Sequence, residues 1–308
     1  MLTVGRVSVD LYPEQIGIAL AEVRTFRKML GGSATNVAVA AARLGRRSAV
    51  ITKVGDDPFG PYVRQALRGF GVDPSRVGTD PTLRTPIVFC EIFPPDRFPL
   101  LFYRQPQAPD INLRPDDVDL DEVARVPIFW TTGTGLSAEP SRSTTLAALR
   151  ARSGGITVHD LDHRPLFWSS PDEARELGRE AVGLATVVVG NLSEVAVVVG
   201  DLPAEEAAEA LLELGSETAI VKLGHEGVLA RSREERVVAP PIEVEVVNGL
   251  GAGDAFGGAL CHGLLAGWEL ERTIRFANAA GALVASRLGC ADDMGTAEEI
   301  EALLAASS

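Results

Sequence analysis

The chain has 308 residues, of which 46% are hydrophobic and 23% are charged, and its formal net charge is −13. This composition is ordinary for a globular protein with a large core, and the acidic balance argues against a nucleic-acid or anionic-membrane surface. No apolar run reaches the ~18 residues of a membrane span. The three cysteines form no CxxC pair and the first residues carry no export signal, so we expect buried free thiols in a cytoplasmic enzyme.

Strand-like and helix-like segments alternate along most of the chain. Leu2–Leu11 has the loose alternation of a strand, and a helix that Ser33 or Thr35 can cap is expected to end at Gly45. Further elements follow in chain order: a strand at 49–54 and a helix at 59–70, a strand at 128–132 and a helix from about 139, a strand at 156–160 and a helix from about 171, a strand at 185–189 and a helix at 193–199, and a helix at 204–214 before a strand at 219–221. Such alternation predicts an α/β fold, with a mostly parallel central sheet and helices on both faces.

One region breaks this alternation. Thr85–Ile92 and Leu100–Arg104 are strand-like and have no helix between them, which predicts a β-hairpin, and Ile18–Phe26 is a candidate third strand. A small antiparallel sheet inserted in this way predicts a lid over a ligand site at the carboxyl ends of the central strands, or else an edge hairpin or a homodimer surface. We therefore expect one domain over residues 1–308, with lid segments at about 11–30 and 85–105.

The segment Asn248–Gly258 carries the strongest chemical signal. Three glycines lead into Asp254 and a helix-like run in which Phe256, Leu260 and Leu264 recur at intervals of four. Glycine lets backbone N–H groups approach an anion, and a helix N-terminus adds partial positive charge. A carboxylate at such a site is explained if it accepts a proton from the group that attacks a phosphate, so the segment indicates phosphoryl transfer. A dinucleotide-binding turn and an ordinary acid in a first helical turn are the alternatives.

Lysine usage excludes one common nucleotide-binding loop. The chain has only three lysines, Lys28, Lys53 and Lys222, and none is followed by Ser or Thr. A Walker A loop needs Gly-Lys-Ser or Gly-Lys-Thr, so any ATP is bound by a different architecture.

Polar residues near predicted strand ends and helix starts suggest a ligand with several hydroxyls. Gly31–Asn36 is either a plain helix entry or a turn whose backbone and Asn36 amide bind hydroxyls. Asp10 ends the first strand, where a carboxylate can accept hydrogen bonds from two neighbouring sugar hydroxyls or simply form a turn. Asn191 and Glu194 have the spacing of a helix cap, or of two groups that order the water shell of Mg²⁺.

Arginines near these segments suggest an acidic group on the ligand. His159–Arg164 contains two histidines and two aspartates, but no further ligand pair has matching spacing, so we do not expect zinc there. Arg164 is better interpreted as a bidentate hydrogen-bond donor to a carboxylate or phosphate. Arg104, which follows Phe102 and Tyr103 on the expected lid, is a second candidate for the same role.

Two segments together resemble the signatures of the ribokinase-like (PfkB) carbohydrate kinases. Gly31–Gly45 resembles the first signature and Gly251–Phe256 the second, and Asn191–Glu194 and Val221–Gly224 lie between them as in that family. The resemblance covers essentially the whole chain. It implies a ribokinase-like fold and ATP-dependent phosphorylation of a carbohydrate hydroxyl, with Mg²⁺ as cofactor.

The resemblance also implies roles for individual residues. Asp254 corresponds to the catalytic base, and the backbone N–H groups that form the anion hole are those of Gly251, Ala252 and Gly253. The residues implied to contact the substrate are Asp10, Gly32 and Asn36, with Arg104 and Arg164 as carboxylate partners. The residues implied on the nucleotide side are Asn191, Glu194, Lys222, Gly224, Gly227 and Asn278, the first two of which reach Mg²⁺ through water.

Within the family, four segments are similar to kinases of keto-deoxy sugar acids: Asp10–Pro13, Phe89–Pro95, Phe102–Arg104 and Asn248–Asp254. A sugar acid explains the candidate arginines, whereas kinases of neutral sugars such as fructose are the nearest alternative. A regulator that senses sugars without catalysis and a nicotinamide-dependent oxidoreductase are the alternatives from other classes.

One departure from the family concerns a monovalent cation. Many members have an aspartate where this chain has Asn248, and that aspartate helps to bind the cation behind the anion hole. Because Asn248 carries no charge, potassium activation is left open here, with the backbone carbonyls of Arg287–Cys290 as other ligands.

Overall fold

The computed structural model describes residues 1–307, and these form two β-sheets and ten α-helices. The strands of the large sheet are β1 (Leu2–Val4), β4 (Ser48–Gly55), β5 (Val72–Asp73), β6 (Val77–Asp80), β9 (Ile128–Thr132), β10 (Ile156–Asp160), β11 (Val187–Asn191), β12 (Thr218–Lys222), β13 (Val228–Ser232) and β14 (Arg236–Ala239). They lie in the order β14-β13-β12-β11-β10-β9-β1-β4-β5, with β6 also paired to β4. All pairs are parallel except β12–β13 and β13–β14. The mostly parallel sheet that the alternation predicted is therefore confirmed.

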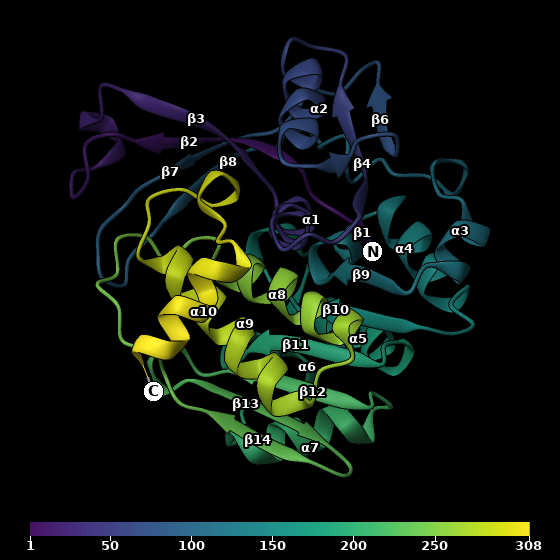
Figure 1. Cartoon of the computed structure of the whole chain (residues 1–308). Coiled ribbons are helices and arrows are strands. Elements are labelled where there is room, and N and C mark those ends of the chain that lie inside the picture. The colour runs from purple at the N-terminus through teal and green to yellow at the C-terminus, as the bar shows by residue number, and fades with distance from the viewer. Residues whose placement is uncertain (308) are drawn as a thin grey trace.

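Helices cover both faces of this sheet (Figure 1). They are α1 (Ser33–Arg43), α2 (Phe59–Gly69), α3 (Leu120–Arg125), α4 (Ser141–Arg150), α5 (Pro171–Leu184), α6 (Leu192–Val199), α7 (Ala204–Glu213), α8 (Ala252–Ala266), α9 (Leu270–Ala285) and α10 (Ala297–Ala306). Strand β9 shows how period-2 alternation serves two layers, because Ile128 and Trp130 pack in the core formed with α1, α8 and α9, whereas Phe129 packs in the core formed with α3 and α4. No helix within residues 1–307 has both the length and the apolar character needed to cross a membrane.

The second sheet has four strands and lies apart from the large one, in purple and blue at the upper left of Figure 1. Its strands are β2 (Ser8–Pro13), β3 (Phe26–Gly31), β7 (Ile87–Cys90) and β8 (Leu100–Tyr103), in the order β3-β2-β7-β8. The hairpin expected from residues 85–104 is the antiparallel pair β7–β8. Strand β2 joins it by pairing in parallel with β7 and antiparallel with β3.

Two predictions about this region are wrong. The single strand expected at Leu2–Leu11 is two strands in different sheets, because Gly5 adopts φ 146° and lets the chain turn between them. Ile18–Phe26 is not the added strand, since it contains only a short 3-10 turn at Leu20–Glu22 and an extended loop before β3. The larger apolar side chains before β3, Ile18, Leu20 and Val23, are only partly buried and do not keep the spacing of two that one face of a strand needs.

The first helix begins without the side-chain cap that we expected. Gly32 is its N-cap residue, with φ 101°, and a Cβ there would lie 2.4 Å from the carbonyl oxygen of Arg6. Only glycine fits this turn. Ser33 and Thr35 use their hydroxyls elsewhere, donating to Asp254 and to the Arg6 carbonyl respectively. Because no side chain is needed as the cap, the Ser33 hydroxyl can bind Asp254.

Candidate active site

A cavity lies between the second sheet and the N-terminal ends of α1 and α8, and it encloses about 60 Å³. The second sheet contributes Ser8, Asp10, Tyr12, Val88, Leu100 and Phe102, and the two glycine turns contribute Gly32, Ser33, Asn36, Gly251 and Asp254. The carboxyl ends of β9, β10, β11 and β12 form one edge of the large sheet, because these strands are parallel and in register. Ligands of open α/β sheets bind at that edge. The sequence motifs from distant parts of the chain thus meet at one place.

Asp254 is held at the start of α8 by two donors from α1. Ser33 donates to Oδ1 at 3.0 Å, and the Asn36 amide donates to Oδ2 at 2.8 Å. Burial raises the pKa of the Asp254 carboxyl, although these hydrogen bonds oppose the rise. The carboxylate is therefore fixed in position and is a better proton acceptor than an exposed aspartate.

The turn before Asp254 presents backbone N–H groups at the end of a 15-residue helix. Gly251 is the N-cap in a left-handed conformation with φ 82°, and a Cβ there would lie 2.4 Å from Cys290 Sγ. Among the described residues, no backbone acceptor takes the N–H groups of Ala252 and Gly253. These donors and the helix dipole suit an anion.

Asp10 lies on β2 and lines the same cavity. Ser8 donates to its Oδ1 at 2.6 Å, and burial raises the pKa of the Asp10 carboxyl to about 6. The backbone of Gly31 runs so close that a Cβ there would meet the carboxylate. Asn36 brings an unpartnered acceptor to this region, because its Oδ1 is buried and accepts no hydrogen bond from the described residues. Asp10 and Asn36 together can bind several hydroxyls.

The two predicted arginines have different surroundings. Arg164 lines the cavity and pairs with Asp162 at 3.1 Å. Arg104 does not line it, and its guanidinium pairs instead with buried Asp110 at 2.7 Å and lies 5.2 Å from the ring centre of Phe167. The sequence analysis missed Arg6, which does line the cavity and also pairs with Asp162, at 3.0 Å. No motif marks Arg6, since a single arginine after a short strand has no pattern around it.

Asn191 and Glu194 form the helix cap that their spacing allows. The Asn191 side chain accepts from the Glu194 N–H at 2.9 Å, while Glu194 Oε2 accepts from the Asn191 N–H at 2.8 Å. The other carboxylate oxygen, Oε1, lies 3.9 Å from Arg164. Among residues 1–307 no group of three His, Cys, Asp or Glu side chains has the geometry to hold a metal. Because Oε1 accepts no hydrogen bond from residues 1–307, it suits a contact with the water shell of Mg²⁺, which keeps several waters and is bound largely by substrate phosphates.

Lys222 ends β12 close to the start of α8. A Cβ on Gly253 would lie 3.2 Å from its ammonium nitrogen. Burial lowers the pKa of Lys222, but the negative charges of Asp160 and Glu194 outweigh that effect and raise it. The lysine is therefore charged beside the N–H groups of the glycine turn, where it adds to the attraction for an anion.

The remaining residues predicted on the nucleotide side lie after the end of β12 and in α9. Gly224 and Gly227 flank the turn between β12 and β13. Gly227 has φ 97°, and a Cβ at this position would clash with the Ala239 carbonyl oxygen. The Asn278 amide donates to the Pro240 carbonyl at 2.8 Å and lines a small separate pocket with residues 239–242. The structure thus groups Lys222 with the glycine turn, and Asn278 with the loop after β14.

His159 and the three cysteines are buried groups that the sequence analysis did not assign to the site. His159 is buried, and burial lowers its pKa to about 4, so the imidazole is neutral and its Nδ1 pairs with Thr131 Oγ1 at 2.8 Å. All three cysteines are free and buried, as expected. Cys290 nevertheless lines the cavity, where its Sγ lies 2.8 Å from the hydroxyl of Tyr12.

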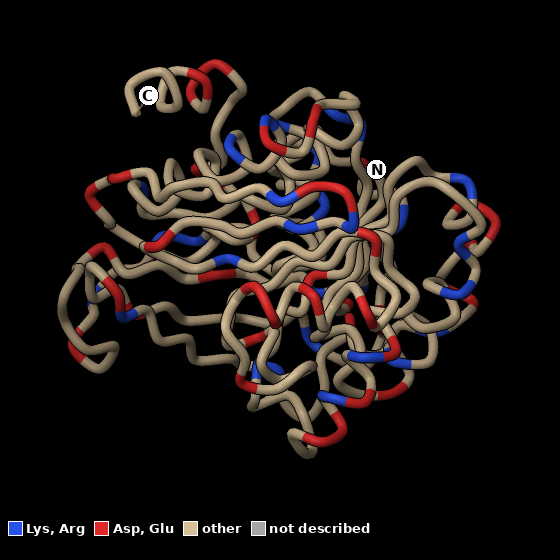
Figure 2. The backbone as a smooth tube through the Cα atoms, turned by 90° about the horizontal axis from the view of Figure 1, so that it is seen from below, with Lys and Arg blue, Asp and Glu red and all other residues tan. Residues whose placement is uncertain are grey.

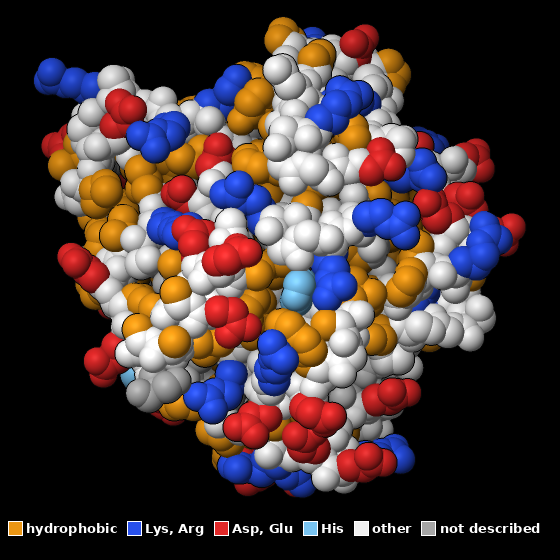
Figure 3. Space-filling view, in the orientation of Figure 1, with side chains coloured by type: hydrophobic (Ala, Val, Ile, Leu, Met, Phe, Trp, Pro, Cys, Tyr) orange, Lys and Arg blue, Asp and Glu red, His pale blue; other side chains and the backbone are white. Residues whose placement is uncertain are grey.

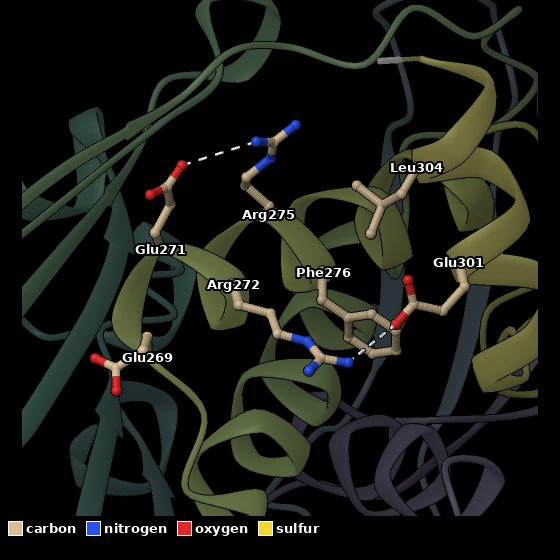
Figure 4. A pocket seen from close by; sticks show the side chains of 7 residues that line it. All are labelled: Glu269, Glu271, Arg272, Arg275, Phe276, Glu301 and Leu304. Carbon is tan, nitrogen blue, oxygen red and sulfur yellow. Dashed lines mark ion pairs between the residues drawn. The ribbon is translucent and has the colours of Figure 1, made fainter.

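A second hollow lies on the outside of the molecule, between α9 and α10 (Figure 4). Its charged side chains pair with one another, Arg272 with Glu301 at 3.6 Å and Arg275 with Glu271 at 3.7 Å. Arg272 also stacks over the ring of Trp268, 4.0 Å from its centre. Because none of the site residues predicted from sequence lines it, this hollow is not the candidate active site.

Comparisons with known proteins identify the family to which the chain belongs. The model of the family described as pfkB family carbohydrate kinase matches residues 1–297. The 5-dehydro-2-deoxygluconokinase of Clostridium perfringens is 32% identical over 98% of this chain and 91% of its own length. Fructokinase from Vibrio cholerae, solved with fructose, ADP and calcium, is 29% identical with a TM-score of 0.87 over 98% of both chains. An uncharacterized sugar kinase from Pyrococcus horikoshii in complex with ATP is 28% identical, with a TM-score of 0.82 over 99% of both chains. The chain belongs to the pfkB family of carbohydrate kinases.

Proposed function

We propose that this carbohydrate kinase transfers the γ-phosphoryl group of ATP to the C6 hydroxyl of 5-dehydro-2-deoxy-D-gluconate, a step of myo-inositol catabolism. The observation that carries the proposal is the position of Asp254. Its carboxylate is fixed by Ser33 and Asn36 beside the free N–H groups of a glycine turn, in a cavity that also holds two arginines. The name of the Clostridium perfringens relative supports the choice of sugar acid.

In this mechanism Asp254 is the late acceptor of the hydroxyl proton. The hydroxyl oxygen forms a bond to the γ-phosphorus while the bond to the bridging oxygen of ADP breaks, and the proton passes to Asp254. A sugar hydroxyl is far less acidic than a carboxylic acid, but in a loose transition state its proton becomes acidic as the O–P bond forms. The raised pKa of Asp254 favours acceptance of that proton.

The phosphates would lie against the start of α8. The N–H groups of Gly251, Ala252 and Gly253 form the anion hole, and Lys222 adds its charge from β12. Mg²⁺, when bound, neutralises charge on the phosphates, and Glu194 and Asn191 would contact its water shell. Gly224, Gly227 and Asn278 would then line the space for the nucleoside. The ATP and ADP in the sugar kinase and fructokinase structures support a nucleotide here.

The substrate would lie between the second sheet and α1. Asp10 and the unpartnered Asn36 Oδ1 would accept hydrogen bonds from its hydroxyls, and Gly32 lets the backbone approach it. We expect the second sheet to act as a lid whose closure excludes water that would otherwise hydrolyse ATP. Arg104 could bind the carboxylate of the substrate only if it gave up its ion pair with Asp110.

The buried environment of Asn248 does not suit a monovalent cation. Its Nδ2 donates to the Leu288 carbonyl at 2.7 Å, and its Oδ1 accepts from the Leu250 N–H at 3.0 Å. An N–H donor thus takes one acceptor site of the Leu288 carbonyl, within the segment 287–290 that the sequence offered as a source of ligands. We therefore propose that the turn is held by this amide and needs no potassium.

A second copy of the chain is the proposed partner of the outer face of the second sheet. Leu101 and Tyr103 on β8 are 47% and 61% exposed, and Tyr103 continues a row of edge-to-face aromatic contacts with Phe89 and Phe26. Hydrophobic side chains gather over this sheet at the upper left of Figure 3. Acidic and basic segments are interspersed over the backbone (Figure 2), and the net charge of −13 argues against nucleic acid as a partner.

The test is an ADP-release assay across 5-dehydro-2-deoxy-D-gluconate, 2-keto-3-deoxygluconate, fructose, ribose and nucleosides, with the phosphate located on the product by ³¹P NMR. We expect the first compound to give the highest kcat/KM and a C6 phosphate. A higher value for 2-keto-3-deoxygluconate or fructose would assign the chain to those kinases instead. No ADP release with any compound would favour a sugar-sensing regulator, and binding of NAD would reopen the oxidoreductase alternative.

A further inference from the structure

Arg6 is a buried arginine that reaches the candidate active site from an unexpected place. It lies in the short connection between β1 and β2, where the chain passes from the large sheet to the second sheet. Only 8% of its side chain is exposed, yet it lines the cavity together with Arg164. Burying a guanidinium is costly unless it is paired, so its surroundings indicate what it does.

One carboxylate holds both arginines. Asp162 Oδ2 accepts from Arg6 at 3.0 Å, and its Oδ1 lies 3.1 Å from Arg164. Thr134 fixes the arrangement further, since its hydroxyl donates to Asp162 Oδ2 at 2.9 Å and accepts from Arg6 Nε at 3.1 Å. Burial raises the pKa of Asp162, but the two arginines outweigh it and bring the pKa below its usual range. Asp162 is therefore ionised and pairs with both guanidinium groups, and the Glu194 carboxylate also lies 3.9 Å from Arg164.

Each arginine keeps a donor without an acceptor. Arg6 Nη1 has no hydrogen-bond partner among residues 1–307, and Arg164 Nε is buried and unpartnered there. The group formed by Arg6, Arg164 and Asp162 thus keeps two donors without acceptors, on two residues that line the cavity. A carboxylate accepts from two donors at once, so it satisfies both.

We infer that Arg6, together with Arg164, binds the carboxylate of the sugar acid and sets the preference of this kinase for acids over neutral sugars. Asp162 is the positioning residue that orients the two guanidinium groups. This inference rests on the proposed function, because it identifies which end of the substrate each wall of the cavity contacts.

The other charges of the cavity fix the direction in which the substrate lies. Asp10 and Asp254 also line it, and their carboxylates would repel the carboxylate of the substrate. The acidic end therefore lies at Arg6 and Arg164, and the hydroxyls lie at Asp10 and Asp254. Arg104 is the other candidate for binding the carboxylate of the substrate, but it is paired with Asp110 and does not line the cavity.

Binding and kinetics together test this inference. Calorimetry with D-gluconate and D-glucitol, which differ by a carboxylate in place of a hydroxymethyl group, compares wild type with Arg6→Met, Arg6→Lys and Arg104→Gln. Arg142→Met is the matched control, because Arg142 also pairs with one carboxylate, Glu173, but lies outside the cavity. Circular dichroism and the thermal shift caused by ATP verify that each variant is folded.

We expect Arg6→Met to weaken D-gluconate binding by about 10- to 100-fold and to leave D-glucitol binding unchanged, as loss of hydrogen bonds to a charged group predicts. KM for the sugar acid should rise similarly while kcat stays within about threefold, since the contact is present in both ground and transition states. Arg6→Lys keeps a positive charge near Asp162 but loses the bidentate guanidinium group. Its D-gluconate affinity should therefore lie between those of the wild type and Arg6→Met. If Arg6→Met does not fold, weaker D-gluconate binding by Arg6→Lys than by Arg142→Met tests the same inference.

Three results would overturn the inference. They are unchanged D-gluconate binding in the Arg6 variants, a fall in kcat with constant KM, and loss of D-gluconate binding in Arg104→Gln alone. The calorimetry needs no turnover, so a wild-type protein that binds D-gluconate through Arg6 but phosphorylates no sugar acid would refute the proposed function and leave the role of Arg6 intact.

Discussion

The Asn36 amide donates a 2.8 Å hydrogen bond to Asp254 Oδ2, although 218 residues separate them in the chain. This bond joins the first turn of α1 to the first turn of α8, and the two helices pack closely along their lengths. The contact brings together the two glycine-rich segments that the sequence marked.

Asp10→Asn should stabilise the fold at neutral pH. Burial raises the pKa of the carboxyl from 3.8 to about 6, so above pH 6 the wild-type protein holds a buried charge that the unfolded chain leaves in water. The folded protein takes up a proton as the pH falls from 6 towards 4, and the penalty disappears over that range. The variant should gain up to about 3 kcal/mol at pH 7 and almost nothing at pH 4.

Urea unfolding of both proteins between pH 4 and pH 8 measures this difference. A gain that is independent of pH would show that the carboxyl does not titrate as described. The variant should also bind the sugar more weakly, because an amide replaces the acceptor for two hydroxyls.

Gly258→Ala should disturb the contact between α1 and α8. A Cβ at this position would lie 2.3 Å from Ala40 Cβ and 2.9 Å from the Ala41 nitrogen, so the helices must separate. Overpacking of this kind costs about 1–3 kcal/mol. We expect a lower unfolding temperature and a lower kcat, because the bond from Asn36 to Asp254 lengthens as the helices move apart.

Gly69→Ala is the matched control for this helix substitution. Gly69 is the last residue of α2, and nothing lies within 4 Å of its Cβ position. It should be neutral or slightly stabilising. Equal unfolding temperatures for both variants would contradict the packing argument.

Turnover should be insensitive to potassium. Replacing K⁺ by tetramethylammonium at constant ionic strength should change kcat/KM by less than about twofold, because the Asn248 N–H already satisfies the Leu288 carbonyl. The measurement is the ADP-release rate in each salt. A tenfold or larger loss without K⁺ would mean that a cation is bound near this turn in spite of Asn248.

Leu101→Glu should dissociate a dimer formed through the second sheet. A charge on the exposed face of β8 would be buried against a second copy without a partner. Light scattering should give the mass of two chains for the wild type and of one chain for the variant. A mass of one chain for the wild type at micromolar concentration would contradict the proposal that a second copy binds here.

The sequence predicted those parts of the site that local patterns encode. Asp254 and Asn36 were identified because glycine turns and helix starts place them, whatever the rest of the chain does. Arg6 and Asp162 were not identified as a pair, since a shared carboxylate depends on how β1 and β10 lie in the sheet. Leu2–Leu11 looked like one strand because its apolar content continues through the turn at Gly5. The strand character of these residues was predicted correctly. Their division between two sheets depends on tertiary packing, which local patterns do not encode.

The hypothesis that Asp254 is the catalytic base is tested most directly by the variant Asp254→Asn. The measurement is kcat for ADP formation with 5-dehydro-2-deoxy-D-gluconate, together with the Kd for ATP. The amide keeps the size of the side chain but cannot accept the hydroxyl proton, so kcat should fall at least about 100-fold while the Kd stays within about threefold. Turnover close to that of the wild-type enzyme, in a variant that binds ATP normally, would contradict the mechanism.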